Sequence, residues 1–178
     1  MAEAFSNKVA RAAGIVTSTT GGAIGITTNL ITGISTVHVA VNDLVDTGNF
    51  ILGTKVTNIG VSSVTCDRDS TNTTAATSQS VKFLGVTTAY TSTSTKSILV
   101  GGTFANNTSN SVNLTVQVWD NSASTEVAIA GKIPVPNGSS FVITDAGKTV
   151  LESSDEVRIY CDTANAIDAT LSILTGVS

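Results

Sequence analysis

The sequence predicts an all-β protein: an antiparallel β-sandwich with a second small β-domain, inserted or in tandem, and a short N-terminal helix or arm. The first observation is that apolar side chains occupy every second position of residues 112–119. This is the period of a half-buried strand. The second is that turn signals such as Asn106-Asn107 and Pro136-Asn137-Gly138 separate such runs, as in small antiparallel sandwiches. The third is composition. Only 12% of the residues are charged while 41% are hydrophobic, so Thr, Ser and Asn must supply the polar surface, and Thr favours strands.

The N-terminal residues 1–13 are predicted to form a short helix or a flexible arm. Phe5, Val9 and Ala12 share a face at helical spacing, and Gly14 is a natural stop. Phe5 and Val9 are the candidate assembly residues, because their apolar face is too small to close a domain but large enough to dock in a neighbour's groove. A frayed terminus is the alternative.

Two strand-rich regions follow. The first spans residues 24–84, and its apolar runs are 30–34, 37–41, 55–59, 64–66 and 81–84. Within it, the polar segment 67–80 is expected to be an exposed loop. A Ser/Thr-rich stretch at 87–95 leads into the second region, whose runs are 96–104, 112–119, 156–161 and 167–174. The period of two places five side chains in one sandwich core: Leu114, Val116, Val118, Leu171 and Ile173.

Charge and hydropathy argue against several classes of partner. The net charge is −4 and the nine Lys and Arg residues are scattered, so no basic footprint for nucleic acid is present. No apolar run approaches the length of a membrane span, and charges interrupt the region where a signal peptide needs an apolar core. We therefore expect no nucleic-acid or membrane partner and synthesis in a cytoplasm. Cys66 and Cys161 are expected to be packed core residues, with a disulfide as the alternative.

No constellation of reactive residues is evident. His38, the sole histidine, has no Ser or Cys nucleophile motif nearby. The run 67–72 has carboxylates at alternate positions but lacks the glycine and the distal glutamate of a calcium loop. The aromatic residues available for a glycan platform are Trp119, Tyr90 and Tyr160. We expect no catalytic, cofactor-binding or metal-binding residue, no cofactor, and no enzymatic activity.

The pattern of strands and turns resembles known phage proteins. The segments that carry the first resemblance are 97–107, 112–119, 133–139, 150–155 and 167–174. They are similar to a small β-module in structural proteins of tailed-phage virions, especially those of marine and cyanobacterial phages, and residues 1–7 are similar to the start of that group. The middle of the chain resembles another phage-virion β-module. Its segments here are Thr32-Gly33-Ile34, then Asn42-Asp43-Leu44-Val45 with Asn42 where the module has Gly, then residues 53–59.

The resemblance implies an architecture and a role. Residues 24–84 would be a small β-domain inserted near the first strand of a sandwich made of 1–23 and 85–178, and a simple tandem of two domains is the alternative. The implied function is a non-enzymatic virion structural protein, first of all a capsid decoration protein that binds the particle lattice in many copies. A neck, collar, tail or baseplate component, or a host- or glycan-binding module displayed on the virion, is the alternative. The expected partners are further copies of the chain and other virion proteins such as the major capsid protein, in a virion assembled after synthesis in the host cytoplasm.

Overall fold

The computed structural model describes residues 3–93, 96–144 and 148–177 and divides the chain into two compact units. The sandwich unit comprises Met1–Gly14 and Thr87–Ser178, and the intervening unit comprises Ile15–Val86. Strands make up both units, and the described residues contain no helix, so the predicted all-β class is confirmed. The domain boundaries expected near residues 24 and 84 fall inside strands β2 (Ile15–Ile24) and β7 (Ala76–Gly85).

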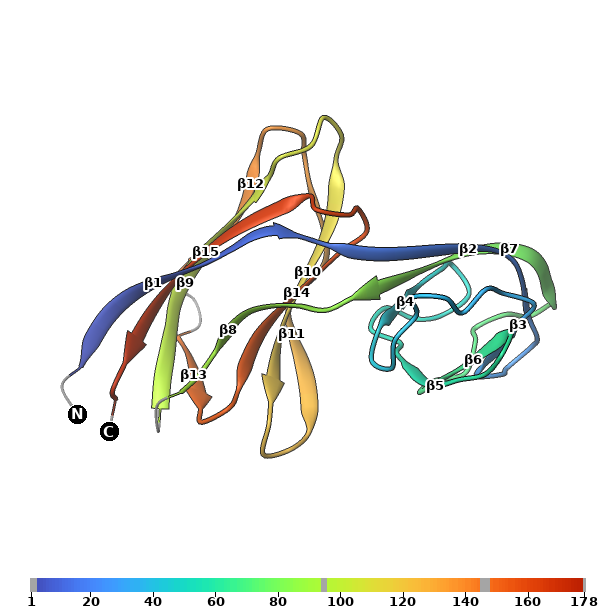
Figure 1. The fold of residues 1–178 in the computed structure, drawn as a ribbon, viewed down its shortest axis with the longest axis horizontal. Coiled ribbons are helices and arrows are strands. Elements are labelled where there is room, and N and C mark those ends of the chain that lie inside the picture. The colour runs from blue at the N-terminus through green and yellow to red at the C-terminus, as the bar shows by residue number, and fades with distance from the viewer. Residues whose placement is uncertain (1–2, 94–95, 145–147, 178) are drawn as a thin grey trace. The chain divides into compact units, whose positions relative to one another are not determined.

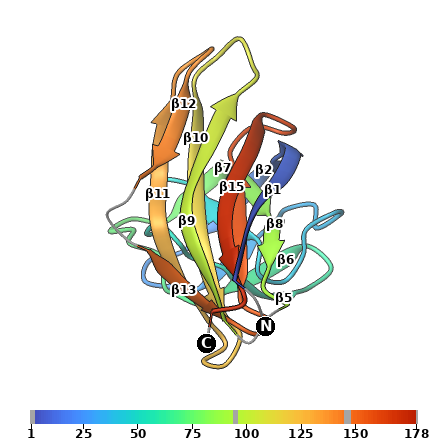
Figure 2. The same ribbon diagram turned by 90° about the vertical axis from the view of Figure 1, so that its left-hand side faces the viewer.

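The sandwich unit is built from two antiparallel sheets (Figures 1 and 2). The first, the β9 sheet, has the order β1 (Ala4–Ala13), β15 (Ile167–Thr175), β9 (Lys96–Asn106) and β12 (Ser140–Ile143), with β13 (Thr149–Glu152) also paired to β9. The second, the β10 sheet, has the order β11 (Thr125–Val135), β10 (Val112–Asp120), β14 (Glu156–Cys161) and β8 (Thr87–Thr91).

The pairing of these strands is nested. Within the sandwich unit the first strand pairs with the last (β1 with β15), and the second with the next to last (β8 with β14). The same rule continues inward, because β9 pairs with β12 and β13, and β10 pairs with β11. All these pairs are antiparallel. A nested order distributed over two packed sheets is the topology of a jelly roll.

The core of the sandwich unit lies between the two sheets and is mainly aliphatic. Four of the five side chains predicted to form it are fully buried, namely Leu114, Val116, Leu171 and Ile173, and the fifth, Val118, is partly buried against the same cluster. Phe104 and Cys161 are also fully buried there. The alternation of strands β10 and β15 therefore predicted the inward face correctly.

The intervening unit is a six-stranded sheet that closes on itself. Its order is β4 (Leu44–Asp46), β7, β2, β3 (Leu30–Thr32), β6 (Ser63–Cys66) and β5 (Val56–Ile59). Backbone hydrogen bonds then join the two ends: Val56 N donates to Asp43 O (3.0 Å), and Val45 N donates to Thr54 O (2.8 Å). A small barrel results, which leaves few free strand edges. The segments 42–45 and 53–59, which carry the second phage resemblance, form this closing contact.

The barrel encloses its own aliphatic core, which includes Ile24, Ile31, Phe83 and Cys66. Cys66 and Cys161 are both buried free thiols, as expected for packed core residues. Burial, with a smaller contribution from the nearby Asp67 carboxylate, raises the pKa of the Cys66 thiol to about 12. The described part of the chain contains no helix long and apolar enough to cross a membrane.

Two local predictions were wrong. Residues 4–13 form strand β1 and not a helix. Phe5 and Val9 are four residues apart, a spacing that fits both a helical turn and two full strand periods. The segment 67–80 is not one exposed loop, because Ala76–Ser80 belong to strand β7 and Ser70 is buried. The Ser70 hydroxyl donates to Gly25 O at 2.9 Å, so hydrogen bonding accounts for the burial of this polar side chain.

Candidate assembly surface

The outward face of the β9 sheet carries a row of large apolar side chains that crosses four strands. In this apolar row Phe5 lies opposite Leu174, Leu174 opposite Ile98, and Ile98 opposite Val150. Residues directly opposite one another share a face of the sheet. Their sequence neighbour Ile173 is fully buried in the core, so the apolar row points away from it. Phe5 is 76% exposed and Val150 is 53% exposed.

A second row runs parallel to the first. It consists of Val9, Thr170, Thr103 and Val142, which lie opposite one another in register. Val9 is 74% exposed and Val142 is 49% exposed. Neither row contains a charged residue, so covering the side chains of these two rows does not itself bury an ion. Full burial of each large apolar side chain would contribute about 1.5–3 kcal/mol, which makes the face suitable for packing against another protein.

The structure places the predicted assembly residues Phe5 and Val9 on this face. Both belong to β1, which pairs with β15 from Ala4 to Ala13, so they are held in the body of the subunit and not on a free arm. Their outward position agrees with the expected exposure. Their role in assembly stays a prediction.

Strand β1 is also an edge of the β9 sheet, and Lys8 lies on its core-facing side. In the register Lys8 is opposite Leu171, which is fully buried, yet Lys8 itself is exposed. An inward-facing charge at a sheet edge disfavours addition of a further strand, because pairing would bury the ammonium group. The geometry therefore favours contacts through the face of this sheet over contacts through the edge.

The β10 sheet carries a network of charged side chains that the sequence did not reveal. Arg158 on β14 is paired with Glu126 on β11 and, at 2.7 Å, with Glu156 on its own strand. The Tyr160 hydroxyl lies 3.3 Å from Glu126 Oε2. The Glu126 side chain is only 2% exposed and that of Arg158 is 15% exposed. Glu126 and Arg158 are separated by 32 positions and by the intervening strand β10, so no spacing in the sequence could have paired them.

Burial and the neighbouring charges of this network shift the pKa values of Arg158 and Tyr160. Burial acts to lower the pKa of the Arg158 guanidinium, but hydrogen bonds to Glu156 and Glu126 outweigh burial and raise it above its ordinary value. Burial also raises the pKa of the Tyr160 phenol, and the Glu126 carboxylate raises it further. The guanidinium therefore stays charged and the phenol neutral. This arrangement fixes strands β11 and β14 on either side of β10.

The three aromatic residues considered for a glycan platform do not form one. Tyr90 and Tyr160 are buried. The guanidinium of Arg158 lies over the Trp119 ring, 4.4 Å from its centroid, and so occupies one face of that ring by a cation–π contact. Trp119 thus belongs to the charged network.

The other chemical candidates are His38 and Asp67. His38 is exposed in a loop, and Asp67 accepts a hydrogen bond from the Lys55 backbone (2.8 Å) through Oδ1. Among the described residues, no group of three or more His, Cys, Asp or Glu side chains is arranged to hold a metal ion. The carboxylate of Asp67 therefore serves the local backbone.

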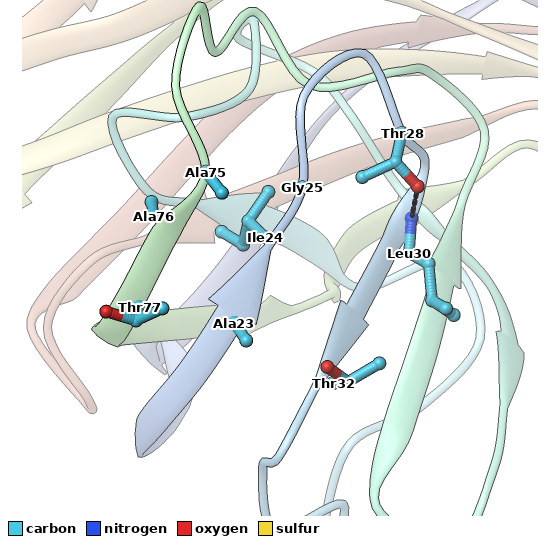
Figure 3. A pocket seen from close by; sticks show the side chains of 9 residues that line it. All are labelled: Ala23, Ile24, Gly25, Thr28, Leu30, Thr32, Ala75, Ala76 and Thr77. Atoms are coloured by element: carbon cyan, nitrogen blue, oxygen red, sulfur yellow. Dashed lines mark hydrogen bonds between the residues drawn. The ribbon is translucent and has the colours of Figure 1, made fainter.

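A shallow groove of about 330 Å³ lies at one end of the barrel, where the paired part of β2 and β3 ends (Figure 3). Small or apolar residues provide most of its lining: Ala23, Ile24, Gly25, Leu30, Ala75 and Ala76, with Thr28, Thr32 and Thr77. The strands separate beyond the pair Ile24 and Ile31, which opens the groove. The Thr28 hydroxyl oxygen accepts a hydrogen bond from Leu30 N at 3.3 Å, so one hydroxyl group of the lining is engaged by the backbone.

Comparison with known proteins gives little further information. No family model matches the chain, and no curated protein matches it. Among solved structures, the crystal structure of the infectious bursal disease virus VP2 subviral particle is similar with 10% sequence identity and a TM-score of 0.32, over 97% of this chain and 72% of that chain.

Proposed function

We propose that this chain is a structural component of a phage virion, and more specifically a capsid decoration protein that binds the particle lattice in many copies. The observation that carries the proposal is the apolar row on the outward face of the β9 sheet, where Phe5 and Val150 remain more than half exposed. Contiguous exposed apolar surface on a soluble domain commonly marks an interaction site. The sequence resemblance to phage-virion modules and the jelly-roll topology, which recurs in viral capsid domains, give independent support.

The proposed mechanism is additive. A face with a few exposed apolar side chains gives a modest affinity for one partner subunit. Copies that are held together on a lattice bind with a high effective concentration, so many modest contacts produce stable attachment. The proposed partners are further copies of this chain and a virion protein such as the major capsid protein. The proposal includes synthesis in the host cytoplasm, no enzymatic activity, and neither nucleic acid nor membrane as partner.

The experiment is to locate the chain on purified particles. A gold-labelled antibody raised against the chain is viewed by negative-stain electron microscopy, and quantitative mass spectrometry gives the copy number relative to the major capsid protein. Label over the whole head with a copy number comparable to that of the major capsid protein would support decoration. Label confined to the neck, tail or baseplate would refute decoration but retain a virion role, and absence of the chain from particles would refute both.

A matched pair of variants then tests the surface. Phe5→Ser with Val9→Ser removes apolar side chains from both rows, whereas Val127→Ser with Ile129→Ser removes exposed apolar side chains from β11 in the other sheet. Loss of particle binding by the first pair alone is expected. Equal binding by the two pairs would exclude the β9 sheet face as the attachment surface.

A further inference from the structure

The first strand of the sandwich unit carries its side chains on the faces opposite to those that burial favours. The inward positions of β1 are Ser6, Lys8 and Ala10, which lie opposite fully or almost fully buried residues of β15. Its large apolar side chains, Phe5 and Val9, point outward and are 76% and 74% exposed. Among the described residues the Ser6 hydroxyl finds no hydrogen-bond partner, although its oxygen is buried, and this state costs free energy. The inward face of β1 therefore gains little from the core.

A β-bulge sets this register of β1. Residues 10–13 of β1 lie opposite residues 167–169 of β15, so β1 contains one residue more than its partner at this point. Ala12 lies in the bulge with a φ of 54°, which is unfavourable for a residue other than glycine. Asp168 Oδ1 accepts a hydrogen bond from Ala12 N at 2.7 Å. A side-chain hydrogen bond thus supports the bulge against an unfavourable backbone conformation.

Removal of the bulge would reverse both faces of β1. A slip of one residue moves every side chain of a strand to the other face of the sheet. Without the extra residue, Val9 would lie opposite Leu171, which is fully buried, and Phe5 would turn inward as well. Lys8 would lie opposite Ser172, which is exposed. Because β1 is an edge strand of the β9 sheet, the slip changes its ladder with β15 alone.

Gains and losses oppose each other in the slipped register. That register gains the burial of two large apolar side chains and relieves the strained Ala12. It loses the hydrogen bond to Asp168 and turns Asn7 and Arg11 inward. Lys8 shows that this edge accepts such side chains, because Lys8 faces inward and is nevertheless exposed, and a long side chain reaches water from there. A partner that covers the outward face can therefore decide which register is populated.

We propose that the bulge at Arg11 and Ala12 is a register switch that controls the exposure of the assembly residues. In the bulged register Phe5 and Val9 point outward, and in the slipped register they turn toward the core. Binding to the particle selects the bulged register, so the affinity is reduced by the fraction of chains that are slipped. The inference rests on the proposed function, since it supplies a regulation of the same assembly surface.

Disulfide trapping measures the two registers directly. Thr170→Cys is combined with Val9→Cys, which is opposite in the bulged register, or with Ala10→Cys, which would be opposite in the slipped register. The matched control combines Thr170→Cys with Asn7→Cys, which is opposite in neither. The full chain is oxidised in dilute solution, and peptide mass spectrometry gives the yield of each bond; the two native thiols are buried and present in every sample. We expect the Val9 and Ala10 pairs each to exceed the control at least tenfold, and an Ala10 yield equal to that of the control would overturn the proposal.

Two variants that favour one register each connect the switch to attachment. Deletion of Ala12 removes the extra residue and favours the slipped register, whereas Ala12→Gly relieves the positive φ and favours the bulged register. We expect maleimide to label Val9→Cys at least tenfold more slowly in the deletion background than in the Ala12→Gly background. Without the added cysteine, the deletion variant should lose particle binding and Ala12→Gly should retain it.

The outcomes of these experiments separate the switch from the proposed function. Equal labelling of Val9→Cys in the two backgrounds would overturn the proposal, and so would unchanged particle binding by a deletion variant in which Val9→Cys is protected. Disulfide trapping keeps the bulge residues in place, so that test stands even if the deletion variant does not fold. Trapping and labelling need no particle, so failure of the switch and failure of the virion role are distinguishable.

Discussion

Loss of the Arg158 guanidinium should destabilise the sandwich unit much more than loss of an exposed arginine. Arg158→Met removes the guanidinium that is paired with the Glu126 carboxylate, whose side chain is 2% exposed. Removing one partner of a buried ion pair costs about 3–5 kcal/mol. Because the Arg158 side chain is 15% exposed and water can partly solvate the vacated space, we expect a value at the lower end, about 3 kcal/mol.

A double variant separates the effect of the lost charge from the loss of packing, and two single variants serve for comparison. Glu126→Gln combined with Arg158→Met removes both charges, and we expect it to recover about half or more of the lost stability, since both members of the buried pair are then neutral. Glu156→Gln should cost about 1 kcal/mol or less, because the Glu156 side chain is 24% exposed and partly screened. Arg68→Met is the matched control: its side chain is 45% exposed and lies 3.8 Å from Asp67, so the expected cost is below about 1 kcal/mol.

Urea unfolding followed by tryptophan fluorescence is the appropriate assay. Trp119 is the sole tryptophan and lies in the sandwich unit against Arg158, so its emission reports the unfolding of that unit separately from the barrel. A cost for Arg158→Met no larger than that of Arg68→Met would refute the assignment of Glu126 and Arg158 as a stabilising buried pair. Equal stability of Arg158→Met and the double variant would show that the lost packing of Arg158, and not the lost charge, sets the cost.

Further predictions concern the core, the first strand, the outward face and one thiol. Leu171→Ala should destabilise the sandwich unit by about 2–5 kcal/mol, and a loss below half a kilocalorie in the same urea experiment would contradict the core assignment. Deleting residues 2–13 should lower the melting temperature measured by circular dichroism, because it removes a sheet strand paired with β15; an unchanged melting temperature would show that β1 contributes little to the fold. Phe5→Ser with Val9→Ser should leave the melting temperature within a few degrees of that of the unchanged chain, since both side chains are mostly exposed, while particle binding falls. The pKa of the Cys66 thiol is raised from 9.0 to about 12, so the folded state favours the neutral thiol, and the stability this contributes is present below pH 9 and is lost as the pH rises through about 12. Iodoacetamide should therefore label Cys66 slowly in the folded chain and rapidly in urea, and equal labelling rates would contradict its burial.

The sequence predicted the strands whose two faces differ most in polarity. Strand β10 alternates regularly enough that its inward residues could be named in advance, and β14 was predicted with its observed bounds. Strand β11 was not predicted as a strand of 11 residues, because it contains Gly131 and Pro134, which normally interrupt pairing. It is an edge strand of its sheet, where proline is tolerated.

Only part of the candidate surface could be predicted from the sequence. Phe5 and Val9 could be recognised as apolar residues outside the predicted core, although their helical assignment was wrong. Their neighbours in the two rows could not be recognised, because Leu174, Ile98 and Val150 become adjacent only through the register of strands far apart in the chain. The same applies to the pairing of Glu126 with Arg158. Such constellations depend on long-range topology, which local periodicity does not encode.

The nested pairing of the jelly roll also imposes an order on biosynthesis. Strand β1 is made before all the other strands described here but pairs with β15, which begins at Ile167, so about 150 residues must follow β1 before its partner exists. At about 5–20 residues per second, the ribosome needs on the order of ten seconds or more to make them. The barrel, whose strand pairings all lie within residues 15–86, can fold during this interval. The nascent chain therefore carries a folded barrel and an unpaired segment with Phe5 and Val9, so this segment is open to molecular chaperones until β15 has been made.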